Sequence, residues 1–260
     1  MVTGVAAQPI ERLSAAAVLL IAARRDGARI ALGPCRPGTL VDAEAIQRAT
    51  RAALGDRACG WKLGRLGQVY SAPMPADAMR EDDNGTAVLP AGTSIELELA
   101  LRFRTALAPH VLADIGPDDW PDLADLVPLF EFVRTRLAPE SGPGPLDKIA
   151  DCVSNHLAVV GQPTGPWRWD ALDGAIAARL AADDAVIAQH DGRHPSAPLL
   201  PLLDAWRERC RRDRHAVLAG DVVTLGSLTG VLPVPPGRVA FVGIVAGHGQ
   251  IECIVESPAP

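Results

Sequence analysis

Two glutamates lie inside one of the most apolar stretches of the chain, the segment 94–101 with the sequence SIELELAL. In a strand, side chains alternate between two faces, so the apolar residues share one face and Glu96 and Glu98 share the other. Two neighbouring carboxylates repel each other, and their burial costs several kcal/mol each unless positive charge lies between them. The pair therefore either faces solvent on an amphipathic strand or holds a cation.

A third acid, Glu131, interrupts a second apolar run, 126–133, with the sequence LVPLFEFV. Apolar residues on both sides of the acid are typical of a strand that is buried on both faces. Carboxylate oxygens are hard ligands, which favour Mg²⁺ or Mn²⁺ over zinc. The sequence thus leaves two interpretations of Glu96, Glu98 and Glu131: acids on solvent-facing strands, or the ligands of a magnesium or manganese ion.

Composition excludes several classes of protein. The chain has 260 residues, 48% of them hydrophobic, which is enough for one large core. Its net charge of -6 argues against nucleic acid or an anionic membrane surface as the main partner. Five cysteines without a C-x-x-C pair fit a reducing compartment, so we expect a cytoplasmic protein. The apolar run 15–23 is too short to cross a bilayer, so we expect no membrane segment.

Local patterns predict helices first and strands afterwards. Ser14 is expected to cap a helix that ends near residue 25, and Asp42 a second helix that ends at Gly55. Further helices are expected at about 117–125, 170–182 and 199–213, strands at 60–64, 94–104, 126–134, 157–161, 222–227, 239–246 and 250–255, and loops at 139–145 and 189–198. Because the strands do not alternate regularly with helices, a doubly wound sheet is not expected. We expect an α+β chain with one domain over 1–260, helical over 1–58 and mostly β over 59–256.

Three further segments carry polar groups in apolar surroundings. In GWKLG, residues 60–64, Lys62 either reaches solvent or binds a carboxylate or an oxyanion. In DKIADCVSNH, residues 147–156, the polar groups form either a helix cap with a turn or a Cys152–His156 nucleophilic pair, although nothing near the thiol would activate it. The segment 218–230 reads as a turn and a strand that ends in GSLTG, whose hydroxyls either line a pocket or belong to an ordinary turn.

In this order, the motifs resemble those of the 2-keto-4-pentenoate hydratase and 4-oxalocrotonate decarboxylase family, within the fumarylacetoacetate hydrolase superfamily. The matching segments are GWKLG at 60–64, IELELA at 95–100, PLFE at 128–131, ADCVS at 150–154 and GDVVTLGSL at 220–228. The resemblance covers nearly the whole chain, from about Asp42 to Val255. It implies a mixed β-sandwich or β-roll with helices outside it, and a homo-oligomer that in this family can associate with a related decarboxylase or hydratase.

The resemblance also implies the activity. The family acts on small 2-oxo acids from the catabolism of aromatic compounds, and a Mg²⁺ or Mn²⁺ ion held by Glu96, Glu98 and Glu131 stabilises a dienol or enolate. Lys62 and Ser154 would act on the substrate, Asp77 would move protons, and Ser227 and Leu228 would line the substrate site. We therefore expect a hydratase (a hydro-lyase) that adds water to a 2-hydroxy-2,4-dienoate to give a 4-hydroxy-2-oxo acid.

Three alternatives follow in order: a 4-oxalocrotonate-type decarboxylase, an acylpyruvate hydrolase that cleaves a C–C bond, and a non-catalytic partner subunit. The hydrolase branch usually has a histidine and a glutamate before the metal strands, whereas no histidine precedes Glu96 here. Two departures from the family pattern concern the substrate: Cys152 stands where the family has Asn, and the Gly-rich stretch before the late helix is altered at 191–198.

Overall fold

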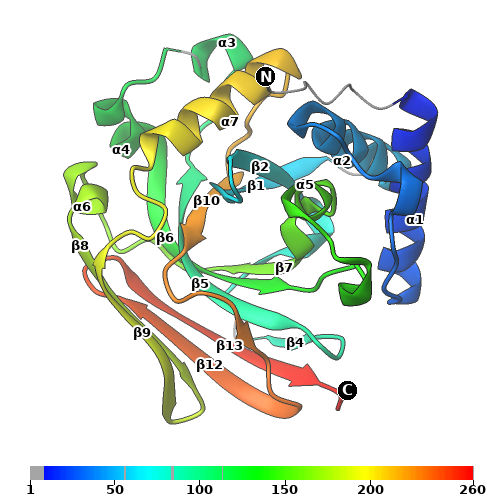
Figure 1. The fold of residues 1–260 in the computed structure, drawn as a ribbon. Helices are drawn as coiled ribbons and strands as arrows, with labels where there is room; N and C mark the ends of the chain where they lie inside the picture. The colour runs from blue at the N-terminus through cyan, green and yellow to red at the C-terminus, as the bar shows by residue number, and fades with distance from the viewer. Residues whose placement is uncertain (1–8, 56, 83–84, 113, 260) are drawn as a thin grey trace.

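Two β-sheets form the body of the protein, and helices cover it at one side and at one end (Figure 1). The computed structural model describes residues 9–55, 57–82, 85–112 and 114–259. The larger sheet contains, in order, β2 (Val69–Pro75), β1 (Ala58–Arg65), β10 (Val222–Ser227), β5 (Ser94–Phe103), β6 (Ala124–Val133), β7 (Asn155–Val160) and β3 (Met79–Glu81), with β11 (Leu232–Pro233) beside β5. The smaller sheet contains β4 (Thr86–Val88), β13 (Gly249–Ser257), β12 (Gly237–Val245), β8 (Ala175–Ala182) and β9 (Ala185–Arg193).

The main core lies between the two sheets. The apolar face of β5 contributes Ile95, Leu97 and Leu99, all fully buried. Phe130 on β6 packs edge-on against Phe241 on β12, with ring centroids 6.4 Å apart. The alternation expected for 94–101 is therefore present, because one face of β5 enters this core and its glutamates face the opposite side of the sheet.

A second core joins the N-terminal helices to that opposite side. Helices α1 (Ile10–Asp26) and α2 (Leu40–Leu54) pack against each other, and α2 packs against α5 (Pro145–Ala150). Their apolar cluster includes Leu20, Ile46 and Ile149 as well as Tyr70 from β2. The expected helical N-terminal layer thus covers the glutamate face of the sheet rather than its far side (Figure 1).

The remaining helices and helical turns are short, except for one. Helix α7 (Leu200–Arg212) packs on β2 and β1. The short ones are α3 (Pro109–Leu112), α4 (Trp120–Leu123) and α6 (Asp170–Asp173), and the 3₁₀ turns are η1 (Gly33–Cys35), η2 (Ala76–Ala78), η3 (Pro117–Asp119), η4 (Pro139–Ser141) and η5 (Cys152–Ser154). None of the helices in the described part of the chain combines the length and hydropathy that a membrane-spanning helix requires.

Several predicted element bounds were wrong at the helix starts. Helix α1 begins at Ile10, so Ser14 lies inside it and does not cap it. Thr39 caps α2, and Asp42, the third residue of the helix, completes the capping box because its carboxylate accepts a hydrogen bond from the Thr39 backbone N–H. Gly55 ends α2 with φ 73, as predicted.

The helix predicted over 170–182 was wrong, because only Asp170–Asp173 is helical and a strand follows. The alanine content of β8 favours a helix, but Ile176, Leu180 and the small residue between them alternate with exposed positions, as in a half-buried strand. The expected loop at 189–198 begins instead as the end of β9. Strand β2 was not predicted because it contains prolines, which an edge strand tolerates.

We expect Gly243→Ala to destabilise the protein by about 1–3 kcal/mol, because close packing between the sheets leaves no room for a methyl group. A Cβ at Gly243 would lie 2.7 Å from both Leu97 Cδ1 and Phe130 Cε1. Gly174→Ala is the matched control, since its Cβ would meet only backbone oxygens at 3.7 and 3.8 Å. Urea unfolding measures both variants, and equal free energies of unfolding would contradict this account of the core.

Candidate metal centre

Strand register brings the three glutamates together. In the antiparallel pair of β5 and β6, Glu96 lies directly opposite Glu131, and Glu98 lies opposite Leu129 two residues further along. One carboxylate oxygen from each of the three glutamates lies within 4.8 Å of the others. Like charges directly opposite each other destabilise a sheet, so this register has an electrostatic cost that the core on the other face must offset.

Lys62 is the nearest positive charge to the three acids. It extends from β1, and its Nζ lies 2.9 Å from Glu96 Oε2 and 2.9 Å from Glu131 Oε2. The contact with Glu96 has hydrogen-bond geometry, whereas the contact with Glu131 is a charge contact alone. Lys62 and Glu96 retain 4% and 6% of their exposure, and Glu98 and Glu131 retain none. Lys62 therefore does not reach solvent, and one ammonium group serves three buried carboxylates.

Burial and the crowding of negative charge change the pKa values of Glu98, Glu131 and Lys62. Burial, and then the charges of Glu131 and Glu96, raise the pKa of Glu98 well above its ordinary value. Burial also raises the pKa of Glu131 to about 7, although Lys62 opposes the shift. Burial alone would lower the pKa of Lys62, but the three glutamates outweigh it and raise that pKa. Lys62 therefore keeps its proton, and the acids lack one further positive partner.

The donor set fits a divalent cation. Within the described residues, both carboxylate oxygens of Glu98 and Oε1 of Glu131 are buried without a hydrogen-bond partner, and Oε2 of Glu131 has only its charge contact with Lys62. Unsatisfied buried polar atoms are rare in native proteins and require an explanation such as an ion. Three hard carboxylate oxygens within 4.8 Å are the kind of ligand set that Mg²⁺ or Mn²⁺ takes, with waters or substrate completing the coordination.

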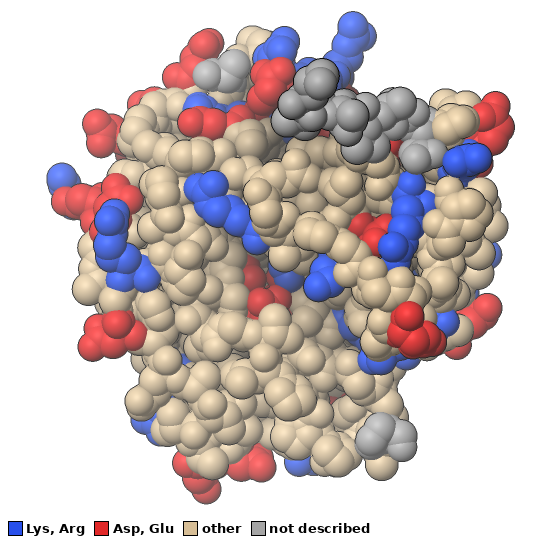
Figure 2. Space-filling model, in the orientation of Figure 1, with Lys and Arg blue, Asp and Glu red and all other residues tan. Residues whose placement is uncertain are grey.

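A cavity of about 590 Å³ opens onto the acids, within the usual size range of small-molecule sites. Figure 2 shows a hollow near the middle of one face, with acidic and basic side chains gathered at it. Lys62, Glu96, Glu98, Ser154 and Ser227 all line this cavity, which we call the catalytic cavity. The hydroxyl of Ser227 is buried without a hydrogen-bond partner among the described residues. The structure thus brings most of the predicted site residues together.

Ser154 is held in the cavity wall by a strained turn. Cys152, Val153 and Ser154 all have left-handed backbones, with φ of 50, 51 and 64. For residues other than glycine this conformation costs roughly 1–2 kcal/mol each, and it persists only where the surroundings enforce it. The turn leads directly into β7, and the Ser154 carbonyl accepts a 2.7 Å hydrogen bond from the Arg134 backbone. Such strain is typical of functional sites.

Arg136 braces the ends of this turn. Its guanidinium donates to both the side chain and the carbonyl of Asp151 at 2.6 Å, and to the Asn155 carbonyl at 2.7 Å. Arg136 and Asp151 are both buried. This buried charge pair is fully hydrogen-bonded, which is the condition under which an internal ion pair is tolerated.

Two predicted site residues, Asp77 and Leu228, do not line the catalytic cavity. Asp77 lines a different cavity and does not join the three glutamates. The Leu228 side chain belongs to the main core, and its backbone N–H donates to the Leu97 carbonyl on β5. Cys152 and His156 do not form an activated pair, because burial raises the pKa of Cys152 and His156 lines the same cavity as Asp77.

Tyr70 and Ser196 line the catalytic cavity but were not predicted. The sequence feature that could have indicated each of them was a glycine, Gly64 in the motif 60–64 and Gly226 in the motif 220–228. A Cβ at Gly64 would lie 2.4 Å from Tyr70 Oη, and a Cβ at Gly226, which has φ 97, would lie 2.4 Å from Ser196 Oγ. These glycines therefore leave room for the side chains of Tyr70 and Ser196 in the wall of the catalytic cavity.

Comparison with known proteins shows what the fold is. No protein-family model matches the chain, and no curated protein matches it. Among solved structures, the 4-oxalocrotonate decarboxylase from Pseudomonas putida G7, complexed with magnesium and adipate, has a TM-score of 0.71 at 17% identity over 96% of this chain and 98% of that one. The 5-carboxymethyl-2-hydroxymuconate delta-isomerase from Mycobacterium smegmatis has a TM-score of 0.51 at 16% identity over 76% of each chain.

A yeast fumarylacetoacetate hydrolase family protein also matches, with a TM-score of 0.51 at 14% identity over 77% of this chain and 94% of that chain. At such identities the likeness concerns the fold alone. The chain therefore has the fold of the fumarylacetoacetate hydrolase enzymes, as the motifs predicted.

We expect Glu98→Gln to raise the unfolding temperature of the metal-free protein, because it removes one of three mutually repelling buried carboxylates. The same change should abolish the further rise that Mg²⁺ or Mn²⁺ causes in the unmodified protein, since a ligand is lost. Thermal unfolding with and without each metal measures both effects. Glu11→Gln on the exposed side of α1 is the control, and an equal metal-induced rise in both variants would contradict the site.

His194 is buried, and its Nδ1 accepts a hydrogen bond from the Ser196 backbone N–H at 3.1 Å. Burial and then His190 lower its pKa to about 4. Because the unfolded chain then binds more protons, the stability that His194 contributes is complete above about pH 6.5 and is lost as the pH falls towards 4. Between pH 7 and pH 5 we expect this loss to be about 1–2 kcal/mol.

Urea unfolding at the two pH values tests this prediction. His194→Asn keeps an acceptor for the Ser196 N–H but does not titrate, so its free energy of unfolding should fall by less than that of the unmodified protein. An equal fall in both proteins would show that His194 does not carry the effect.

Proposed function

We propose that the protein is a divalent-metal-dependent lyase that acts on small 2-oxo acids through an enolate. The observation that carries this proposal is the set of three buried carboxylates around Lys62, with unsatisfied oxygens, at the inner end of a cavity of about 590 Å³. The 4-oxalocrotonate decarboxylase noted above, which shares this fold, was complexed with magnesium. Hydration of a 2-hydroxy-2,4-dienoate to a 4-hydroxy-2-oxo acid is the reaction we propose first.

Glu96, Glu98 and Glu131 would hold the Mg²⁺ or Mn²⁺ ion. When bound, the ion would supply a Lewis acid that polarises the 2-oxo group of the substrate. The three carboxylates would fix its position, because two of them come from adjacent strands in direct register and their side chains are buried.

The other residues would bind the substrate and stabilise charge on it. Lys62 remains charged, and its ammonium group lies where it can stabilise negative charge that develops on the substrate oxygen. The free hydroxyl of Ser227, together with Ser154, would bind the substrate carboxylate. In place of Asp77 we propose Tyr70 as a hydrogen-bond donor to the substrate, because burial raises its pKa, so the phenol keeps its proton, and it lies beside the Lys62 strand.

Decarboxylation of a 2-oxo dicarboxylic acid such as 4-oxalocrotonate is the second candidate, and a separate observation favours it. Arg29, Arg65 and Lys148 also line the catalytic cavity, and all three are exposed. Within the described residues, none of them forms an ion pair with an acid. A second carboxylate at the far end of a substrate would therefore find positive charge at the mouth of the cavity.

Assembly is also a proposal. We propose a homo-oligomer that can associate with a related hydratase or decarboxylase, on the strength of the family resemblance in the sequence. A role in the catabolism of aromatic compounds rests on the same resemblance, and on a fold that is shared with 4-oxalocrotonate decarboxylase.

Purified protein with Mg²⁺ or Mn²⁺ should consume 2-hydroxypenta-2,4-dienoate and form 4-hydroxy-2-oxopentanoate, which chromatography measures. A parallel assay with 4-oxalocrotonate measures CO₂ release. Glu98→Gln should lower the rate more than about 100-fold while the fold survives, because the metal loses a ligand but the acids repel each other less.

CO₂ release without hydration would reverse the order of the two reactions. Consumption of neither substrate in the presence of either metal would refute the proposed function. Unchanged activity in Glu98→Gln would show that the reaction does not use this site.

A further inference from the structure

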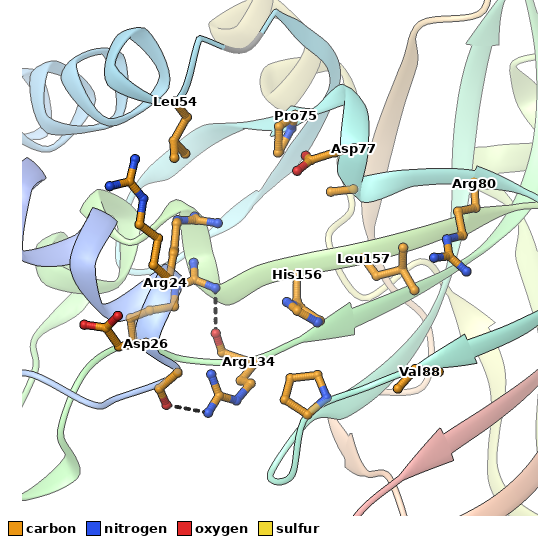
Figure 3. Close-up of a pocket in the computed structure, with 15 residues that line it drawn as sticks. Arg24, Asp26, Leu54, Pro75, Asp77, Arg80, Val88, Arg134, His156 and Leu157 are labelled. Carbon is orange, nitrogen blue, oxygen red and sulfur yellow. Dashed lines mark hydrogen bonds between the residues drawn. The ribbon is translucent and has the colours of Figure 1, made fainter.

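A second cavity of about 590 Å³ lies on the other side of the segment 133–137, which borders the catalytic cavity. Its walls come from the end of α1, the η2 turn and the segments that follow β6 and begin β7. The two cavities have no lining residue in common. Figure 3 shows Arg24 and Arg134 on one side of this second cavity, Arg80 on the other and His156 between them.

One extended segment divides the two cavities. From 133 to 137 the side chains alternate, so that Val133, Thr135 and Leu137 line the catalytic cavity. Arg134 and Arg136 line the second cavity. The extended segment therefore directs two arginines into the second cavity and three uncharged side chains into the catalytic cavity.

Five arginines line the second cavity: Arg24, Arg25, Arg80, Arg134 and Arg136. Arg136 pairs with Asp151. Within the described residues, the other four form no ion pair with a carboxylate. Arg134 donates to the carbonyls of Gly27 and Ala91, and Arg24 donates to Asn155 Oδ1, so neutral acceptors orient their guanidinium groups without cancelling the charge. In addition, Arg24 Nε is buried without a hydrogen-bond partner.

The cavity is therefore positively charged in a protein whose net charge is -6. Asp26 and Asp77 also line it, but with Asp151 included the acids are fewer than the arginines. Burial, and then the positive charges of Arg136, Arg134 and Arg24, lower the pKa of His156 to about 4. The direction of the arginine effect agrees with a positive potential in the cavity. His156 is thus neutral near pH 7 and can donate or accept a hydrogen bond.

We propose that this arginine cavity is a binding site for a small organic dianion, whose phosphate or carboxylate oxygens Arg24, Arg80 and Arg134 would hold. Arginine suits such oxygens because its planar guanidinium donates two parallel hydrogen bonds. The volume exceeds what an inorganic ion needs, and Leu54, Val88 and Leu157 offer an apolar surface to the rest of the ligand. The site is separate from the catalytic cavity and does not depend on the function proposed for it.

Calorimetric titration of the full chain tests the proposal with three probes: adenosine monophosphate, glutarate and inorganic phosphate. We expect at least one of the two organic dianions to bind with a Kd below about 1 mM and more tightly than inorganic phosphate. Binding of the nucleotide alone identifies a phosphate ligand, and binding of glutarate alone identifies a dicarboxylate.

The double variant Arg25→Gln, Arg80→Gln locates the site, because both side chains are exposed and no hydrogen bond of either is needed for the fold. We expect it to weaken binding at least about tenfold. The control Arg179→Gln, Arg193→Gln changes the net charge equally at exposed positions on β8 and β9 and should leave binding unchanged.

Equal weakening in both double variants would overturn the proposal, because it would indicate non-specific attraction by charge. The absence of binding by either organic dianion would also overturn it. A change in the elution volume of the Arg25, Arg80 variant without a change in anion binding would assign the cavity to an interface between copies of the chain.

Discussion

The structure depends on one electrostatic imbalance: three buried carboxylates share a single ammonium group. Lys62 contacts Glu96 and Glu131 at 2.9 Å, but Glu98 has no hydrogen-bond partner among the described residues. A fold that existed only for stability would place apolar residues there, because buried charges rarely contribute more than they cost. The arrangement is therefore explained best by the ion that it would bind.

Register and packing hold this arrangement in place. The pairing of β5 with β6 sets Glu96 opposite Glu131, and a shift by one residue would move the glutamates into the core and the leucines out of it. On the core face, Leu97 and Phe130 pack closely against Gly243 of the other sheet. This packing between the sheets fixes the register of β5 against β6. The hydrophobic core thus offsets the repulsion on the opposite face and pre-organises the site before any ligand binds.

The sequence predicted those parts of the fold and site in which local pattern and tertiary position agree. The strands that carry Lys62, Glu96 and Glu131 were recognisable because single charges interrupt apolar runs. The β8 strand was missed because its alanines favour a helix, whereas its pairing with β12 and β9 makes it extended. The arginine cavity could not be predicted, since its residues come from distant segments, and the position of Asp77 in its wall could not be predicted for the same reason.

Anomalous X-ray diffraction from crystals soaked in Mn²⁺ tests the central claim most directly, because it locates the metal without reference to activity. The account predicts a strong anomalous peak within coordination distance of one carboxylate oxygen from each of Glu96, Glu98 and Glu131, with Lys62 nearby. A peak elsewhere, or none at the three glutamates under conditions in which the metal stabilises the protein, would contradict the account.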